Sequence, residues 1–344
     1  MGLLSWNREN RETGSKKYKS LAFCLLLWLV IPKTAFAEAT YSNPVYEEDF
    51  TVTFNGRTTN LGIGDPAVIL YNGLYYMYAT GDNHSYHVYL SSDLVHWRKG
   101  PVIFETAENG LWAPDVFYNP DDEKFFLYYT VNRRIGVAVS RRPDTLFADK
   151  GTLILGAIDA HMFLDDDGRH FLYYATYPGL NIYVQEMVSP LLKKNAPPVK
   201  LLEPTAPWEK KHIQVTEAPW LLKHNDIYYL IFSGGGSDSM DYAIGYATAK
   251  SPTGPFTRYA GNPIIKKGNG VYGPGHASVT VDNKGNLWMV YHQKKNAQRD
   301  WMRFIALDRL WFDNKGILHG TATRSTEEPA PLTSGPGNQN GQSR

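Results

Sequence analysis

Five segments of the chain share one pattern of apolar and polar positions. Each begins at an acidic or histidine residue, continues as a short apolar run to a polar corner, and returns as an aromatic-rich run. The opening residues are Asp65, Asp115, Asp159, Glu217 and His276. Runs of β-branched and aromatic residues joined by Gly, Asn or Asp corners are typical of β-hairpins. The pattern predicts five hairpins, with the opening residue at the same position in each.

The spacing of these segments indicates one repeated module. The opening residues stand 50, 44, 58 and 59 positions apart, a period close to that of a propeller blade. A third apolar run follows each hairpin, over residues 87–91, 135–140, 181–186, 243–248 and 304–310. With a weakly marked outer strand, each module becomes a four-stranded antiparallel sheet. We therefore expect an all-β fold, a five-bladed β-propeller.

The composition fits one domain of this kind. Aromatic residues make up 14% of the 344 residues, and no apolar spacing sustains a helical period beyond the N-terminus. All-β proteins of this length commonly form one domain. We place the catalytic domain at residues 38–320. Residues 321–344 are rich in Pro, Gly, Ser and Thr, and we expect a disordered tail there.

Residues 1–37 have the organisation of a secretory signal peptide. Lys16, Lys17 and Lys19 precede an apolar run over 21–31, and Ala35-Phe36-Ala37 supplies small residues at the cleavage site. The run of eleven apolar residues is well short of the ~20 needed to span a bilayer. We therefore favour export over a membrane anchor. The mature protein is expected to be secreted, extracellular or periplasmic, and free of the membrane.

The charge and cysteine content exclude two classes of function. Loss of residues 1–37 removes six basic and two acidic residues and changes the net charge from +1 to −3. A near-neutral protein without a basic stripe lacks the footprint of a nucleic-acid-binding protein. The single cysteine, Cys24, lies inside the signal segment. The mature chain would therefore have no disulfide and no thiol nucleophile.

The opening residues are the candidates for catalysis. The innermost strand of every propeller blade begins at one mouth of the central channel, so residues far apart in sequence converge there. Carboxyl groups crowded in one channel raise each other's pKa, which separates an acid from a base at a single pH. Inverting glycosidases hold two carboxyl groups roughly 6.5–9.5 Å apart, with room for a water. The pattern points to hydrolysis of glycosidic bonds.

Five motifs, in sequence order, resemble the blade motifs of glycoside hydrolase family 43. They are Asp65-Pro66, Ala113-Pro114-Asp115-Val116, Ile158-Asp159, Glu217-Ala218-Pro219 and Gly273-Pro274-Gly275-His276, followed by Arg303-Phe304-Ile305-Ala306. The resemblance implies that Asp65 is the general base and Glu217 the general acid. It implies that Asp115 tunes and orients the acid. His276 resembles a channel histidine near the substrate or a structural calcium ion.

Two positions depart from the family pattern. Glu217 is followed by Ala218 where Gly is usual, and Asp159 is followed by Ala160 where Pro is common. The first change lies beside the expected acid and affects how the sugar ring approaches. The resemblance gives Asp159 no proton-transfer role. We expect it to take a structural or hydrogen-bonding part in the substrate channel.

Three further residues are candidates for binding the sugar. Trp112 directly precedes the second motif, and its flat face suits a wall of the subsite; a core tryptophan is the alternative. Asp82 lies on a loop of the first module, where side chains reach the channel mouth. Arg303 is expected to hold a substrate hydroxyl or to brace Asp65 or Glu217, with a surface ion pair as the alternative.

A run of acidic residues at 165–167 resembles a metal site at first sight. Its spacing is not that of a calcium loop, and Gly168 places it at a hairpin corner. Solvated turn residues are the better interpretation. No metal ligand set is predicted from these or other residues.

The sequence therefore predicts a secreted, inverting glycoside hydrolase acting on pentose-containing plant polysaccharides or oligosaccharides. α-L-Arabinofuranosidase is the first hypothesis and β-xylosidase the second, followed by endo-arabinanase and a β-galactosidase-type specificity. A non-catalytic glycan-binding propeller is the competing class, and a fructan-active propeller with a retaining mechanism is the enzymatic rival. The expected partner is a carbohydrate substrate. The hydrolysis requires no cofactor, and a structural calcium in the channel near His276 is the one metal considered.

Overall fold

The computed structural model describes residues 39–54 and 56–333. The expected signal peptide and residues 334–344 of the expected tail lie outside the described residues. The described part is built almost wholly from β-strands, and its one helix is a single 3-10 turn, η1 (Pro207–Lys210). None of its helices is long and apolar enough to cross a membrane.

Five antiparallel sheets follow one another along the chain, and each is made from a continuous segment. Blade 1 holds β4 (Gly64–Tyr71), β5 (Leu74–Thr80), β6 (Ser85–Ser91) and β7 (Arg98–Glu105). Blade 2 holds β8 (Trp112–Asn119), β9 (Lys124–Val131), β10 (Arg134–Ser140) and β11 (Ala148–Leu155). Blade 4 holds β17 (Glu217–His224), β18 (Ile227–Gly234), β19 (Ala243–Ala249) and β20 (Thr257–Arg258). Blade 5 holds β21 (Gly275–Val281), β22 (Leu287–Lys294), β23 (Arg303–Phe312) and β24 (Leu318–Gly320).

Blade 3 differs at its outer edge. Its first three strands are β12 (Ala157–Leu164), β13 (His170–Thr176) and β14 (Ile182–Ser189). Two short strands, β15 (Leu192–Lys193) and β16 (Val199–Leu202), both pair with β14 and share the outer position. Pro197 and Pro198 lie between them. Proline cannot donate to a strand ladder, which explains why this edge strand is divided.

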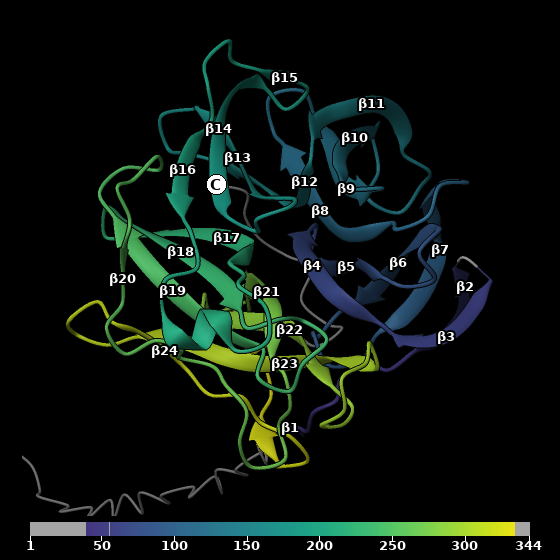
Figure 1. Cartoon of the computed structure of the whole chain (residues 1–344), viewed down its shortest axis with the longest axis vertical. Helices are drawn as coiled ribbons and strands as arrows, with labels where there is room; N and C mark the ends of the chain where they lie inside the picture. Colours follow the sequence, from purple (N-terminus) through teal and green to yellow (C-terminus); the bar gives the residue numbers. More distant parts are fainter. Residues whose placement is uncertain (1–38, 55, 334–344) are drawn as a thin grey trace, which may run out of the picture. The chain divides into compact units, whose positions relative to one another are not determined.

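The first strands of the five blades lie next to one another in sequence order, and β21 returns to contact β4. Figure 1 shows the five sheets arranged around a common centre. The predicted five-bladed propeller is confirmed. The predicted third strands are confirmed as well, with ends that differ by one to three residues.

Buried tyrosines join neighbouring blades. The hydroxyl groups of Tyr78, Tyr128 and Tyr173 donate to backbone carbonyl groups of the next blade, those of Pro143, Pro190 and Pro252, over 2.8, 2.8 and 2.6 Å. All three side chains are fully buried. A buried hydroxyl needs such a partner, so each tyrosine contributes both apolar area and one directional bond between blades. This use explains part of the high tyrosine content.

Two small elements lie outside the blades. The hairpin of β2 (Asp49–Phe54) and β3 (Arg57–Gly62) precedes blade 1. The short strand β1 (Thr40–Tyr41) pairs with β25 (Glu328–Pro329). Both ends of the described chain therefore meet at one place.

The disordered tail expected from residue 321 does not hold for the first part of that segment. Besides the pairing of β25, Thr323 donates from its backbone and its hydroxyl to Asp308 over 3.0 and 2.7 Å. Asn43 binds the same carboxylate at 3.1 Å. Backbone pairing and a buried carboxylate hold residues that composition alone assigns to disorder.

Candidate active site

Each innermost strand contains one β-bulge at the same place. The ladder between first and second strands shifts register between Gly64 and Ala67, and at the equivalent points of the other four blades. The first unpaired residue of each bulge has a left-handed backbone: Asp65 (φ 53°), Ala113 (φ 42°), Asp159 (φ 58°), Ala218 (φ 53°) and His276 (φ 51°). This conformation is strained for non-glycine residues and persists only where surrounding contacts hold it.

The backbone N–H of the left-handed residue is held by a side chain in every blade. In four blades the acceptor lies on the second strand of the preceding blade, namely Thr80, Thr130, Ser233 and His292, at 2.8–3.2 Å. The equivalent position in blade 3 is Ala175, which has no acceptor atom. There the Asp159 carboxylate accepts the N–H of Ala218 at 3.1 Å instead.

The bulge corrects the expected register of the opening residues. Asp65, Asp159 and His276 occupy the left-handed position, whereas Glu217 comes one residue earlier and Asp115 two residues later. The hypothesis that all five share one position is therefore wrong. A bulge interrupts the regular alternation of side chains along a strand and re-aims them, so residues at different positions of the bulge can reach the same edge of the channel.

Asp65 is almost buried, and one of its oxygens is surrounded by nitrogen atoms. Its Oδ1 lies 2.8 Å from Nη1 of Arg303, 3.1 Å from Nδ1 of His292 and 3.3 Å from Nδ1 of His276. Burial alone raises the pKa of Asp65, but Arg303 and the two histidines outweigh it and hold the pKa well below its usual range. Asp65 is therefore ionised at neutral pH. All three partners belong to blade 5.

Two glycines make room for the groups that hold the catalytic candidates. A Cβ atom on Gly64 would lie 2.4 Å from Cζ of Arg303. A Cβ atom on Gly275 would lie 2.0 Å from the ring of Tyr242. Both contacts are shorter than van der Waals distance, so any larger residue would displace the partner of Asp65 or of Glu217.

Glu217 is buried at the start of β17. Its Oε1 accepts a hydrogen bond of 2.8 Å from the hydroxyl of Tyr242. Burial raises the pKa of Glu217 to about 7, Asp65 adds to the rise, and the Tyr242 hydroxyl and Arg303 oppose it. Glu217 thus holds a proton at mildly acidic pH, while Asp65 does not.

Asp159 is the carboxyl group that interacts electrostatically with both. Burial raises the pKa of Asp159 well above its usual range, and the charges of Glu217 and Asp65 raise it further. Its side chain also bonds the residue after Glu217, as described above. We call Asp65, Asp159 and Glu217 the channel cluster.

Asp115 has other partners. Its Oδ2 accepts the backbone N–H of Met162 at 2.8 Å and lies 3.5 Å from Nδ1 of His161. Both residues belong to β12 of the next blade. The His161 ring stacks on Trp220, with 4.1 Å between ring centroids. Asp115 therefore joins blades 2 and 3.

Of the remaining predicted residues, one contacts the channel cluster and the others take part in the structure of a nearby loop. Arg303 braces Asp65, one of the expected alternatives. Trp112 is half-buried, and its Nε1 donates to Asn83 at 3.1 Å. Both oxygens of Asp82 are bound within its own loop, by the backbone of His84 and by Ser85. Asp82 thus shapes the loop that holds Trp112, and its carboxylate does not face a ligand freely.

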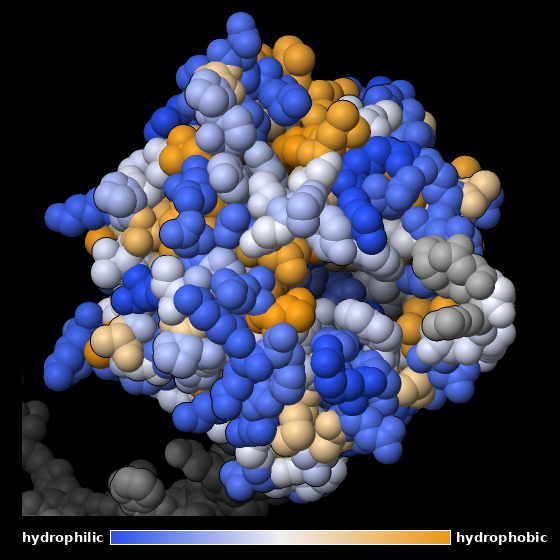
Figure 2. Space-filling model, in the orientation of Figure 1, coloured by the Kyte–Doolittle hydropathy of each residue, from blue (hydrophilic) through white to orange (hydrophobic). Residues whose placement is uncertain are grey.

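A hollow opens where the blades meet. A cavity in the channel is lined by residues of all five blades, among them Asp115, Asp159, His161 and His276. Figure 2 shows a central depression with hydrophilic residues at its bottom and apolar residues on part of its rim. Polar groups at the bottom of a hollow with an apolar rim suit a hydroxyl-rich ligand.

The surroundings of His276 do not fit a calcium ion. Calcium takes six to eight oxygen ligands, whereas the nearest carboxylate, that of Asp65, is already bound by Arg303. Within residues 39–54 and 56–333, no three His, Cys, Asp or Glu side chains converge as metal ligands.

Two residues that touch the channel cluster were missed by the sequence analysis. Tyr242 directly precedes β19, and His292 lies near the end of β22. Both residues are outside the five motifs. Their rings stack, with centroids 5.6 Å apart. Gly275 was the available signal for Tyr242, because a glycine there leaves space that another side chain must fill.

Comparisons with known proteins agree with this geometry. Residues 59–318 match the family described as "Glycosyl hydrolases family 43". The chain is 30% identical over 322 residues to "Beta-D-galactofuranosidase xynD" of Aspergillus niger, covering 81% of this chain and 89% of that protein. It is 24% identical over 355 residues to "Extracellular endo-alpha-(1->5)-L-arabinanase 2" of Bacillus subtilis, covering 78% and 69%.

A solved structure extends the match to three dimensions. The crystal structure of a thermostable family-43 glycoside hydrolase superimposes with a TM-score of 0.76 at 34% identity, over 86% of this chain and all of that one (100%). Enzymes of this family generally act without a cofactor. The match over most of the chain, together with the propeller, identifies the protein as a member of glycosyl hydrolase family 43, a family of inverting O-glycosyl hydrolases.

Proposed function

We propose that the protein is an exported furanosidase that cleaves α-L-arabinofuranosyl linkages of plant glycans, with β-D-galactofuranosides as the second substrate class. The observation that carries the chemistry is the opposite pKa shift of two carboxyl groups in one buried cluster. Asp65 is ionised and Glu217 is protonated in the same pH range. This division is the requirement for acid–base cleavage with inversion.

In this mechanism Asp65 acts as the general base. Its Oδ1 is held by Arg303 and lies near Nδ1 of His276 and of His292, so Oδ2 is the oxygen available to accept a proton from water. The water then attacks the anomeric carbon from the face opposite the leaving group. Because Arg303 holds the carboxylate and His292 accepts the backbone N–H of Asp65, the geometry is set before the substrate binds.

Glu217 acts as the general acid on the other face of the sugar. Its proton passes to the glycosidic oxygen as the bond breaks. The Tyr242 hydroxyl orients Oε1, which leaves Oε2 to carry the proton. A pKa of about 7 is near the operating pH, where general acids work best.

Asp159, rather than Asp115, takes the part of tuning and orienting the acid. Support comes from the charge of Glu217, which raises the pKa of Asp159, and from the bond between the Asp159 side chain and the backbone N–H of Ala218. Asp115 is engaged by Met162 and His161, and we assign it the joining of two blades.

The choice of sugar rests on the relatives. The names of two relatives refer to galactofuranoside and arabinan cleavage. α-L-Arabinofuranose and β-D-galactofuranose have the same ring configuration and differ in the exocyclic chain, so one pocket can hold both rings. Trp112 and His276 are the residues we assign to this pocket, and export is proposed from the signal pattern of residues 1–37 and the extracellular relative.

Parallel assays test the proposal. Aryl α-L-arabinofuranoside, β-D-galactofuranoside and β-D-xyloside, each with the same leaving group, are compared by kcat/KM. Turnover of the first above the second, and of both above the xyloside, is expected; preference for the xyloside overturns the sugar assignment. Proton NMR of the first product anomer must show inversion, and a retained anomer overturns the mechanism.

A further inference from the structure

We propose that Trp301 forms a wall of the substrate site on the side of the base and packs against the glycone, the sugar whose bond is cut. The inference rests on the proposed glycosidase function of the channel cluster. Trp301 lies on the connection between β22 and β23, outside the sequence motifs. Its side chain is 42% exposed, so a ligand can reach the indole.

The connection that carries Trp301 is held by a buried lysine. The side chain of Lys294 has no exposed area, and its ammonium group binds the Asp300 carboxylate at 2.7 Å and the Asp300 backbone oxygen. The same carboxylate accepts the N–H of Met302 at 3.0 Å. Burying an ammonium group is costly unless it is fully paired. The residues on both sides of Trp301 are therefore fixed by an interaction that the catalytic mechanism does not use.

Two further contacts hold the same connection from outside. The backbone N–H of Gly62, at the end of β3, donates to the Trp301 carbonyl at 2.8 Å. Arg299 binds Asp238 at 2.6 Å, a residue of the neighbouring blade. The indole is thus presented on a rigid support, which lowers the entropy lost when a ligand packs on it.

Arg303 contacts both the indole of Trp301 and the base, and so relates their positions. The guanidinium carbon of Arg303 lies 5.9 Å from the centroid of the Trp301 ring, within range of a cation–π interaction. The same guanidinium donates to Asp65 at 2.8 Å. One side chain therefore separates the exposed indole from the base.

This placement assigns Trp301 to the glycone. In an inverting reaction the base and its water lie on the face opposite the leaving group, and the acid lies on the leaving-group side. A surface next to Asp65 thus contacts the sugar that is attacked, whereas the leaving group departs towards Glu217. The apolar C–H face of a sugar is the surface an indole can cover.

The test compares two tryptophans of equal exposure. Trp301→Ala is expected to raise KM for the preferred aryl furanoside, and the inhibition constant of the free monosaccharide, by roughly tenfold or more, the range of a central aromatic contact. The dependence of rate on the leaving group stays unchanged. Trp311→Ala is the matched control: Trp311 is also 42% exposed but lies near the opposite end of β23, stacked on His319. Trp301→Phe should keep most of the binding.

Two results would overturn the assignment. One is unchanged KM and inhibition constant in Trp301→Ala. The other is a loss confined to kcat with a shifted acidic limb of the pH profile, which would mean that the indole acts on Asp65 through Arg303. Saturation-transfer NMR of free L-arabinose and D-galactose with the wild type and Trp301→Ala tests the same wall without turnover. The wall can therefore be tested even if the proposed hydrolysis fails.

Discussion

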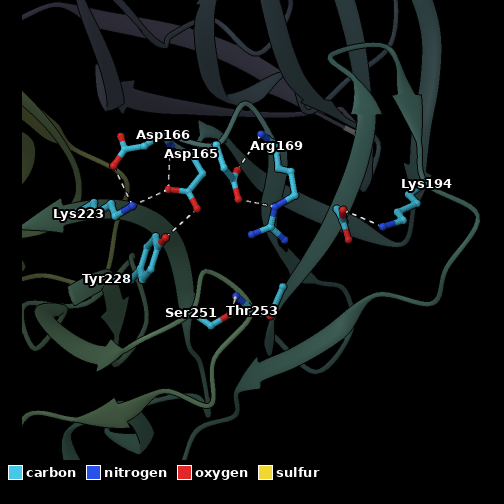
Figure 3. A network of polar contacts seen from close by, with 10 residues as sticks. Asp165, Asp166, Arg169, Lys194, Lys223, Tyr228, Ser251 and Thr253 are labelled. Carbon is cyan, nitrogen blue, oxygen red and sulfur yellow. Dashed lines mark hydrogen bonds and ion pairs between the residues drawn. The ribbon is translucent and has the colours of Figure 1, made fainter. Parts of the chain in front are cut away.

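Two groups of three carboxylates in this protein behave in opposite ways. The channel cluster holds Asp65, Asp159 and Glu217, and the corner cluster, at the hairpin of blade 3, holds Asp165, Asp166 and Asp167. In the corner cluster Lys223 binds Asp165 at 3.1 Å and Asp166 at 2.8 Å, and Arg169 binds Asp167 at 2.7 Å. Figure 3 shows Lys223 between its two carboxylates and Tyr228 directed at Asp165.

The number of cations decides the difference. Two basic side chains serve the corner cluster. Burial raises the pKa of Asp165, yet the bonds from Tyr228 and Lys223 outweigh it and the pKa lies below its usual value. In the channel cluster Arg303 is the one strong cation bonded to a member, because burial lowers the pKa of both His276 and His292 and leaves them neutral. The channel is short of positive charge, so it retains a proton that can be given to a substrate.

The largest effect is expected from the base. Asp65→Asn removes the group that activates water and should lower kcat/KM by ~10²–10⁴ on every glycoside, the usual contribution of a general base. Folding should be retained, since the amide keeps the shape of the side chain. Circular dichroism and kcat/KM on several leaving groups check both statements. Activity within tenfold of the wild type would remove Asp65 from the mechanism.

The acid should be distinguished by its pH dependence. Glu217→Gln should lose ~10²–10⁴ in rate on substrates with poor leaving groups but far less on dinitrophenyl glycosides, which depart without a proton. The wild type should lose activity as pH rises through about 7, where Glu217 gives up its proton, and the variant should not. An unchanged alkaline limb in the variant would contradict the assignment.

The same variant has a consequence for stability. The folded pKa of about 7 lies above the ordinary value of 4.5, so the unfolded chain releases this proton first. The wild type therefore loses stability as pH rises from about 4.5 to about 7. Above pH 7, the free energy of unfolding of Glu217→Gln should exceed that of the wild type by an amount on the order of 1–3 kcal/mol, which a higher melting temperature reports. The difference should vanish near pH 4.

The corner cluster should affect folding and leave catalysis intact. Asp165→Ala leaves the Tyr228 hydroxyl without its acceptor and Lys223 with Asp166 alone, and it should lower the free energy of unfolding by about 1–3 kcal/mol. Urea denaturation measures this loss, and kcat/KM should stay within twofold. Asp167→Ala is the control, because the exposed pair with Arg169 should contribute less than about 1 kcal/mol. A catalytic defect in Asp165→Ala would break the contrast between the clusters.

The smallest expected effect distinguishes a threonine that acts on the general acid through Asp159 from one that only supports the fold. Thr130 and Thr80 make the same contact, accepting the N–H of Asp159 and of Ala113. Thr130→Val and Thr80→Val should each cost about 1–3 kcal/mol by leaving a buried N–H unpaired. Only Thr130→Val should move the alkaline limb of the pH profile, because a displaced Asp159 no longer holds the backbone N–H of Ala218 beside Glu217. Thr130→Ser should restore the limb; equal shifts in both valine variants would contradict the role of Asp159.

The repeat made the fold predictable. Five apolar hairpins with similar spacing specify five sheets, because alternating apolar runs and polar corners are local features. The corner at 165–167 was predicted as a solvated turn, which is correct for Asp166 and Asp167 but wrong for Asp165, which is buried and accepts a hydrogen bond from Tyr228. Contacts from another blade carry no local signal.

The site was predictable in its residues more than in its register. Pro66, Pro114 and Pro219 each follow a left-handed residue, so alignment on proline would have placed Asp65, Ala113 and Ala218 in one column. Ala160 and Ala277 replace this proline in the other two blades, which hid the pattern. The role of Asp159 depends on the missing acceptor at Ala175 of its own blade, and only the pairing of strands shows that.

The partners of Asp65 make activity depend on the contact between the first and the last blade. Blade 1 supplies the base, and the last blade supplies all three side chains that hold it. These blades contact each other through β4 and β21 but lie at the two ends of the propeller segment, so no single connection of the chain joins them directly. On heating, a small separation of blades 1 and 5 would displace the base from its partners while every blade kept its strands. Activity should therefore be lost a few degrees below the temperature at which the β-sheet signal in circular dichroism is lost. A covalent link between blades 1 and 5 should bring the two transitions together.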